Sequence, residues 1–214
     1  MQSIRWHIAQ WFELRWWQNY LGKKNKQEYL AWKKNYWLNV LQQVSDVLHI
    51  KPSDTIADLG CGPAGMFIAL PNKFTAVDPL LNEYKEKLAF FDTADYPNTT
   101  FIASPLEEYS ATPHNIVSCM NCINHVHDIE KAFDVVVQSM KPTGTLLLSI
   151  DTHNYSLFKH LFRAVPGDIL HPHQYNLAEY EAFLKQRGLE IVKRVELKHE
   201  FIFNHYIVAA RYSM

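Results

Sequence analysis

The residues best suited to chemistry lie in one stretch, between Thr55 and Leu80, which reads TIADLGCGPAGMFIALPNKFTAVDPL. A short apolar run ends at Asp58 and leads into a turn with glycines at 60, 62 and 65, and a second apolar run ends at Asp78. Glycines let a backbone approach a ligand closely, and the N-terminus of a following helix offers free N–H groups. An acid after the second strand can accept two hydrogen bonds from a ribose. The pattern predicts a strand–turn–helix–strand unit with a ligand-binding turn.

The run Asp58-Leu59-Gly60-Cys61-Gly62, together with Asp78 and the later Lys141-Pro142-Thr143-Gly144, resembles the class I S-adenosylmethionine-dependent methyltransferases, in particular the small-molecule enzymes of the ubiquinone and menaquinone group. The resemblance implies that the turn from Gly60 through Cys61 to Gly62 contacts the methionine part of the cofactor. It also implies that Asp58 helps to hold the amino group and that Asp78 holds the ribose.

Five further residues are predicted to contact the cofactor, again by resemblance. In the family an acid commonly follows the third strand and receives the adenine amino group, whereas this sequence has Ser104 there. A serine could accept one hydrogen bond, and Leu106 could pack on the purine. The complete predicted set adds Pro79, Ser104, Leu106, Asn121 and Cys122.

A dinucleotide site is the main alternative, because Gly60-x-Gly62-x-x-Gly65 also fits the NAD fingerprint and Asp78 stands near the expected distance. Two features count against it. Asp58 would face the pyrophosphate, where an apolar residue is usual, whereas a sulfonium and an ammonium favour a carboxylate. About fifty residues also precede the turn, although a dinucleotide unit usually opens its chain. A glycine turn without any ligand is the third interpretation.

Composition excludes several classes of protein. The chain has 214 residues, enough for one domain with a sizeable core, and a formal net charge of −1, which gives no electrostatic footprint for nucleic acid. Three cysteines, no signal peptide and no long apolar stretch predict a cytoplasmic protein without disulfides. The pair Cys119-x-x-Cys122 has no second pair to form a metal site, so we interpret it as core packing.

The N-terminus is rich in tryptophan, since all six lie in the first 37 residues. Ser3 could cap a helix that runs to about Leu21. Its large apolar residues lie on opposite sides, so the helix requires apolar cover nearly all round. It could simply pack on the main domain, form a lid with Trp16 and Tyr20 against substrate, lie on a membrane surface, or pair with another subunit.

A second helix is predicted from about Gln27 to Leu48, where apolar residues recur every three or four positions. In similar methyltransferases the helices before the glycine motif cover the cofactor, so Tyr20, Tyr36 and Trp37 are candidates to contact it, although a role in the core is more common. Residues 1–50 are therefore interpreted as an aromatic helical cap or lid, and residues 51–214 as the cofactor-binding domain.

The rest of the chain predicts an α/β fold: a Rossmann-like, seven-stranded, mostly parallel sheet with helices on both faces and a closing antiparallel strand pair. Asn176 should cap a helix that Gly188 ends. The remaining elements are predicted as helices over 81–91, 128–140 and 177–187, and as strands over 100–103, 115–120, 145–150, 190–197 and 201–210, with the turn 141–144 before the fifth strand.

Polar residues after the fourth and fifth strands should face the ligand crevice. His125, His171 and His153 are candidate general bases, because histidine titrates near neutral pH; an ordinary structural histidine is the more common explanation for each. Candidate contacts to the methyl acceptor are Asp151, Asn154, Tyr155 and His173, besides Trp16 and Tyr20. We expect no metal, since Asp151 and Asn154 match a magnesium site poorly and no zinc spacing is present.

Together these observations predict an S-adenosyl-L-methionine-dependent methyltransferase that acts at oxygen or nitrogen of a small, apolar or aromatic acceptor. Two alternatives remain: a catalytically inactive protein that binds the cofactor or scaffolds a partner, and an NAD-linked oxidoreductase. The expected partner is a small molecule rather than a nucleic acid. The N-terminal helix could add a peripheral membrane contact or a contact with a second copy.

Overall fold

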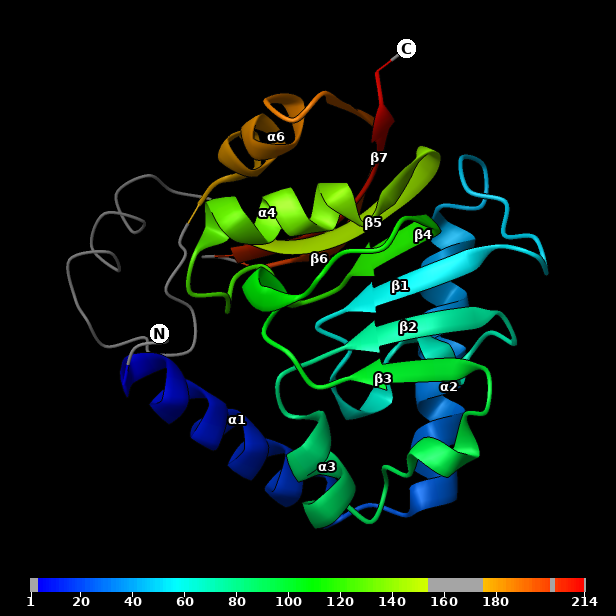
Figure 1. Cartoon of the computed structure of the whole chain (residues 1–214), viewed down its shortest axis with the longest axis vertical. Coiled ribbons are helices and arrows are strands. Elements are labelled where there is room, and N and C mark those ends of the chain that lie inside the picture. The colour runs from blue at the N-terminus through cyan, green and yellow to red at the C-terminus, as the bar shows by residue number, and fades with distance from the viewer. Residues whose placement is uncertain (1–3, 154–174, 201–202, 214) are drawn as a thin grey trace.

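A computed structural model describes residues 4–153, 175–200 and 203–213. Its centre is a seven-stranded sheet in the order β3-β2-β1-β4-β5-β7-β6 (Figure 1). The first five strands are parallel, and β7 runs antiparallel to both β5 and β6, which confirms the predicted fold. The strands are β1 Thr55–Leu59, β2 Lys73–Val77, β3 Thr99–Ile102, β4 His114–Cys119, β5 Met140–His153, β6 Leu189–His199 and β7 Phe203–Tyr212.

Helices cover the sheet and its carboxyl edge. Asn25 caps α2 by accepting a hydrogen bond from Glu28 N, and Asn176 forms the predicted cap of α6 in a reciprocal capping box with Glu179. The α-helices are α1 Ile4–Leu21, α2 Lys26–Gln43, α3 Leu81–Lys87, α4 Ile129–Gln138 and α6 Leu177–Lys185. The described residues also form four 3₁₀ turns: η1 Gly62–Ala64, η2 Met66–Ile68, η3 Thr93–Asp95 and η4 Leu106–Glu108.

Alternation along β1 divides the core into two layers, because successive strand residues point to opposite faces. Ile56 joins the layer formed with α2 and η2, whereas Ala57 and Leu59 join the layer formed with α4 and α6. Asp58 has the same parity as Ile56, so its carboxylate lies on the side of α2. This placement puts a charged group between the glycine turn and the helical cap.

The predicted α-helix between β1 and β2 is wrong, since two 3₁₀ turns make this connection. Gly65 separates them with an extended backbone (φ −72°, ψ −173°), which no continuous helix can contain. A ligand at this turn therefore meets backbone N–H groups of short turns rather than the N-terminus of a helix.

Two predicted boundaries also need correction. The second helix ends at Gln43 rather than near Leu48. Residues 141–144, predicted as a turn before the fifth strand, lie inside β5, where the register with β4 shifts between His114 and Ile116. Gly144 fits there because a Cβ would lie 2.9 Å from Lys141 O and 3.0 Å from His114 O.

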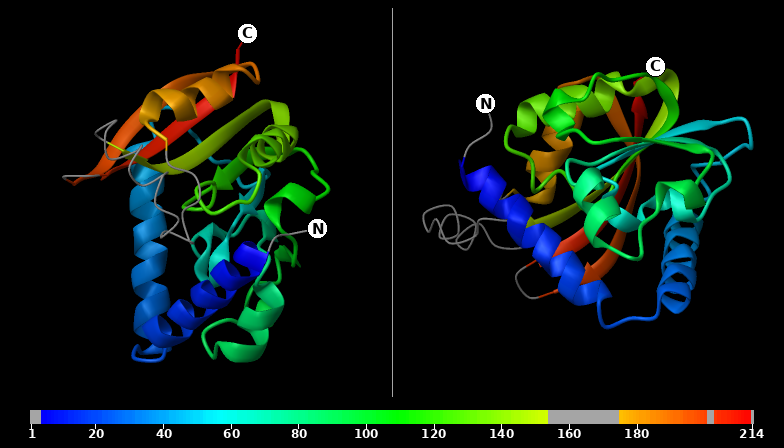
Figure 2. Two further views of the ribbon diagram at one scale, coloured as in Figure 1. Left: turned by 90° about the vertical axis from the view of Figure 1, so that its left-hand side faces the viewer. Right: turned by 60° about the horizontal axis from the view of Figure 1, so that its bottom comes forward.

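The two N-terminal helices approach the sheet differently. The arrowheads of β1, β2 and β3 in Figure 1 point toward the side of the molecule where α1 lies, while α2 crosses behind the strands. Figure 2 shows that α1 occupies an outer edge of the molecule. None of the described helices is both long enough and apolar enough to span a bilayer.

Candidate functional site

The glycine turn is fixed by backbone contacts to the end of β2. Gly60 and Gly62 have positive φ values of 68° and 57°. The amides of Gly60 and Cys61 both donate to Val77 O, at 2.7 and 3.1 Å. A Cβ on Gly60 would lie only 2.2 Å from Cys122 Sγ, so the chain after β4 closes tightly over the turn. Glycine at position 60 is required both by conformation and by space.

Asp58 is buried below this turn. Its Oδ1 accepts a hydrogen bond from Ser118 Oγ at 2.6 Å, and its Oδ2 accepts one from Met66 N at 2.6 Å. Burial raises the pKa of this carboxyl to about 6, against the opposing effect of these hydrogen bonds. Asp58 therefore ties β4 and η2 to the turn and supplies negative charge beside it.

Asp78 is buried at the end of β2 and oriented by two amides. Its Oδ2 accepts from Gly62 N and its Oδ1 accepts from Leu80 N, each at 2.9 Å. Burial, followed by the charge of Glu13, raises its pKa to about 7. A carboxylate has about four acceptor positions, so two remain for a diol.

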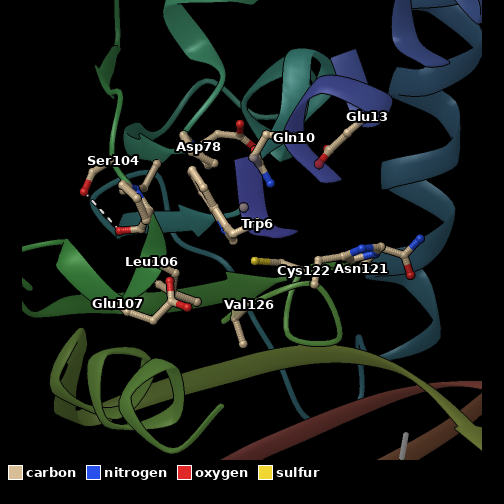
Figure 3. A pocket seen from close by; sticks show the side chains of 15 residues that line it. Trp6, Gln10, Glu13, Asp78, Ser104, Leu106, Glu107, Asn121, Cys122 and Val126 are labelled. Carbon is tan, nitrogen blue, oxygen red and sulfur yellow. Dashed lines mark hydrogen bonds between the residues drawn. The ribbon is translucent and has the colours of Figure 1, made fainter. Parts of the chain in front are cut away.

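A cavity of about 60 Å³ opens at Asp78 (Figure 3). Eight of the predicted cofactor or catalytic residues line it: Gly60, Asp78, Pro79, Ser104, Leu106, Asn121, Cys122 and His125. Ser104 Oγ donates to Pro105 O at 3.0 Å, so a ligand would find an acceptor there. Asn121 has a left-handed backbone (φ 55°), and its amide donates to Ser149 Oγ at 2.7 Å.

The sequence prediction missed three side chains of α1 in this cavity: Trp6, Gln10 and Glu13 (Figure 3). Glu13 accepts a hydrogen bond from Tyr84 OH at 3.3 Å, and burial raises its pKa. Gln10 Oε1 is buried without a hydrogen-bond partner among the described residues. Glu13 is the only acid in the first 27 residues, and this isolation was the one feature of the sequence that could have pointed to it as a site residue.

A second cavity, of about 430 Å³, adjoins the first beneath α1 and α2. The two cavities share Glu13, Gly60, Asn121 and His125. The second is lined mainly by aromatic side chains, which include both predicted acceptor contacts from α1: Trp16, Trp17, Tyr20, Tyr29, Trp32, Tyr36 and Trp37. The Trp16 and Tyr20 rings stack with centroids 4.8 Å apart, and Trp37 Nε1 donates to Ala64 O at 3.0 Å.

Lys33 is the only amine among the described residues that line this aromatic cavity. Its Nζ lies 4.3 Å from the centre of the Tyr36 ring and 4.6 Å from that of Trp37. Burial lowers its pKa to about 8, although the negative charge of Asp58 acts in the opposite direction. The sequence could have pointed to Lys33, because this lysine lies four residues from both Tyr29 and Trp37 and therefore on the apolar stripe of the helix.

The candidate site residues predicted after the fifth strand are not found among the described residues at the two cavities. Asp151 lies within β5 rather than beyond it, its carboxylate faces Nδ1 of His205 on β7, and it lines neither cavity. His153 belongs to β5 through its backbone, and its side chain is not described. Four predicted residues lie outside the described residues: Asn154, Tyr155, His171 and His173.

The described residues contain neither a metal-ligand cluster nor a disulfide. Within residues 4–153, 175–200 and 203–213, no three His, Cys, Asp or Glu side chains come together as metal ligands. Cys61, Cys119 and Cys122 are all free thiols, and Cys119 is buried in the core as predicted.

Comparison with known proteins identifies the family. The model of the methyltransferase domain family matches residues 29–194, which include the glycine turn, both acids and Lys33. The chain belongs to this family. The predicted membership of the class I S-adenosylmethionine-dependent methyltransferases is thereby confirmed. The match also decides against the interpretation of the same glycines as a dinucleotide-binding turn. No curated protein matches the sequence.

Solved structures show the same methyltransferase fold at low identity. A candidate methyltransferase from Bacillus halodurans is 14% identical, with a TM-score of 0.67 over 81% of this chain and 99% of that one. Magnesium protoporphyrin IX methyltransferase from Synechocystis, solved with S-adenosylhomocysteine, is 17% identical, with a TM-score of 0.59 over 84% and 83%. A Haemonchus contortus phosphoethanolamine N-methyltransferase is 16% identical, with a TM-score of 0.62 over 84% and 53%.

Proposed function

We propose that this methyltransferase transfers a methyl group from S-adenosyl-L-methionine to oxygen or nitrogen of a small aromatic or apolar acceptor. The observation that carries the proposal is the cavity of about 430 Å³, which adjoins the glycine turn and is lined by seven tryptophan and tyrosine side chains. Such rings offer large, rigid apolar contact area with few polar groups to satisfy.

The polar residues around the turn fit the cofactor. Asp78 offers its free acceptor positions to a ribose, and the unpartnered Gln10 Oε1 offers another in the same cavity. Asp58 supplies negative charge for an ammonium, and Lys33 supplies an ammonium for a carboxylate. When bound, S-adenosylmethionine supplies a methyl group that the positive charge of its sulfonium already activates. The protein then has mainly to align the acceptor and exclude water.

Residues 1–50 act as the lid in this proposal. The cavity at Asp78 has a volume of only about 60 Å³, which admits a few water molecules but is far smaller than a nucleoside needs. Trp6 lies in the middle of the labelled side chains there (Figure 3). We therefore infer that the N-terminal half of α1 moves outward when the cofactor enters. Leu14 and Leu21 are buried in the core, so deletion of residues 1–22 would also disturb folding, and point substitutions are the sharper test.

A general base is needed only for an acceptor that must lose a proton, such as a phenol or an ammonium. His125 lines both cavities and is the first candidate among the described residues; His153 and His171 stay predictions. If the His125→Gln and His171→Gln variants both keep turnover within about threefold of wild type across the pH profile, alignment alone carries the reaction.

The test is formation of S-adenosylhomocysteine in the presence of a panel of phenols, quinols, aryl amines and small polar amines. We expect turnover with aromatic acceptors, and at least a tenfold rise in KM for a Trp16→Ala/Tyr20→Ala variant. Leu38→Ala, an exposed site on α2 that lines neither cavity, is the matched control. Turnover with polar amines alone would contradict the aromatic acceptor. Cofactor binding without any turnover would favour the inactive scaffold instead.

A further inference from the structure

The outer face of α1 is unusually apolar for a surface helix. Four large side chains on it are exposed: Ile8 by 42%, Trp11 by 50%, Phe12 by 46% and Trp16 by 54%. Trp11 and Phe12 lie three and four residues after Ile8, and Trp16 lies four residues after Phe12, so the four side chains form one continuous strip. The side chains of His7, Ile8, Trp11 and Phe12 also surround a hollow on this face. A contiguous exposed apolar strip of this kind marks a binding surface.

The charged side chains of α1 and of the turn after it that flank this strip are basic. The Arg15 guanidinium lies 4.6 Å from the centre of the Trp11 ring, and Lys24 Nζ lies 4.5 Å from that of Tyr20. Lys23 and Lys24 are exposed at the end of α1. Glu13, the only acid of α1, is half-buried and faces the cavity at Asp78. The outer face of α1 therefore combines tryptophan and phenylalanine with positive charge and carries no acid.

We propose that α1 docks this face onto the surface of a bilayer that contains anionic lipids. Tryptophan and phenylalanine favour the boundary between headgroups and acyl chains, and arginine and lysine bind anionic headgroups. The helix would lie in the interface without crossing it. A second copy of the chain fits less well, because a symmetric contact would bring two identical basic faces together.

Docking on a bilayer would also provide a route by which the methyl acceptor reaches the aromatic cavity. This consequence rests on the proposed function. Trp16 belongs both to the exposed strip and to the lining of the aromatic cavity. An apolar acceptor dissolved in the bilayer would thus reach the cavity beside Trp16 without passing through water. Docking itself does not depend on methyl transfer and can be tested separately from it.

The experiment is sedimentation of the full-length protein with vesicles of phosphatidylcholine and phosphatidylglycerol, and with vesicles of phosphatidylcholine alone. We expect wild type to bind the anionic vesicles, and to bind them more weakly at high salt. Trp11→Ser/Phe12→Ser should weaken binding at least about tenfold, because two large apolar groups no longer enter the interface. Leu38→Ser/Leu197→Ser, which removes two exposed apolar side chains elsewhere, should bind like wild type.

A second variant keeps the test independent of apolar packing. Arg15, Lys23 and Lys24 are all exposed, so Arg15→Gln/Lys23→Gln/Lys24→Gln should fold normally and lose binding to anionic vesicles by tenfold or more. The proposal is wrong if wild type stays in the supernatant, or if both α1 variants sediment as wild type does. It is also wrong if light scattering shows a dimer without vesicles that Trp11→Ser/Phe12→Ser dissociates, since the face would then belong to a second copy.

Discussion

The two adjoining cavities are built in different ways. The cavity of about 60 Å³ at Asp78 is held by the backbone: amides of the turn donate to a buried carboxylate and to Val77 O, and a Cβ on Gly60 would meet Cys122. The cavity of about 430 Å³ is held by side chains, chiefly aromatic rings from α1 and α2. The glycine turn of the first cavity tolerates little change of residue type, because Gly60 needs both its positive φ and the space of a missing Cβ, whereas the second cavity can exchange one ring for another. We therefore expect the first to fix the cofactor and the second to set the acceptor.

The largest effect should come from Gly60→Ala. The new Cβ would lie 2.2 Å from Cys122 Sγ in a backbone of φ +68°, so we expect a loss of about 3 kcal/mol or more in the free energy of unfolding, and loss of cofactor binding. Gly188→Ala has a similar φ of +75° but nothing within 4 Å, and should cost only about 1 kcal/mol. Urea denaturation compares the two. Equal losses would show that the turn is not tightly closed.

Asp78→Asn should come next. The oxygen of the asparagine can still accept one of the two amide hydrogen bonds from Gly62 and Leu80. The substitution, however, removes the negative charge that a ribose diol favours. We expect affinity for S-adenosylhomocysteine to fall about 30-fold, equivalent to about 2 kcal/mol. Calorimetric titration measures the change. An unchanged affinity would remove Asp78 from the cofactor site.

Lys33→Met should have a smaller effect, with Lys34→Met as a matched control. Lys33 Nζ lies over the Tyr36 and Trp37 rings in the aromatic cavity, whereas its neighbour Lys34 is exposed. Loss of one charge-assisted contact to a carboxylate should weaken cofactor binding about tenfold, and the control should change it less than twofold. If Lys33→Met instead raises only the KM of the acceptor, the amine serves the acceptor and not the cofactor.

The pH dependence of binding should be the mildest effect. Asp78, with its pKa raised to about 7, is mostly protonated below that pH, so affinity for the cofactor should rise as pH approaches 7. Lys33, with its pKa lowered to about 8, loses its charge above that pH, so affinity should fall again. Titrations from pH 5.5 to 9 should therefore show a maximum between 7 and 8, and Asp78→Asn should flatten the lower limb.

The free energy of unfolding of the free protein should fall as pH rises toward 7, whereas affinity for the cofactor rises over the same range. A carboxyl whose pKa is raised on folding binds its proton more tightly in the folded state. The contribution of Asp78 is thus full below pH 4, is lost as pH rises toward 7, and is constant above it. Thermal melting of wild type and Asp78→Asn across this range tests the sign. If the melting temperature of wild type falls with pH no more steeply than that of the variant, the predicted contribution of Asp78 is contradicted.

The architecture of the glycine turn and its two acids was predictable from sequence where local constraints act, and their contact with the cofactor stays a prediction. Asp58, Gly60, Gly62 and Asp78 lie within 21 residues of one another, and each residue type has a backbone reason that spacing reveals. Glu13 and Lys33 were missed because they reach the site through the packing of α1 and α2, which no short motif encodes. Asp151 was assigned to the crevice on the assumption that β5 ends before it, whereas pairing with β7 extends the strand to His153.

The same limit applies to the connection after β1. A short apolar segment after a glycine turn predicts an α-helix by analogy with larger units, yet the extended backbone of Gly65 allows only two 3₁₀ turns. A Cβ at Gly65 would lie 2.3 Å from Asp58 Oδ2, so the requirement for this glycine comes from the buried acid beneath it. Contacts of this kind become visible only when the strand and the turn are placed in space.

The most direct test of the account is calorimetric titration of the full-length protein with S-adenosylmethionine, S-adenosylhomocysteine and NADH in parallel, at a pH between 7 and 8. We predict micromolar binding of the first two ligands at one shared site, weakened by Asp78→Asn, and no binding of NADH. Binding of NADH without either S-adenosyl compound would contradict the account and would mean that the acid at Asp58 had been misinterpreted.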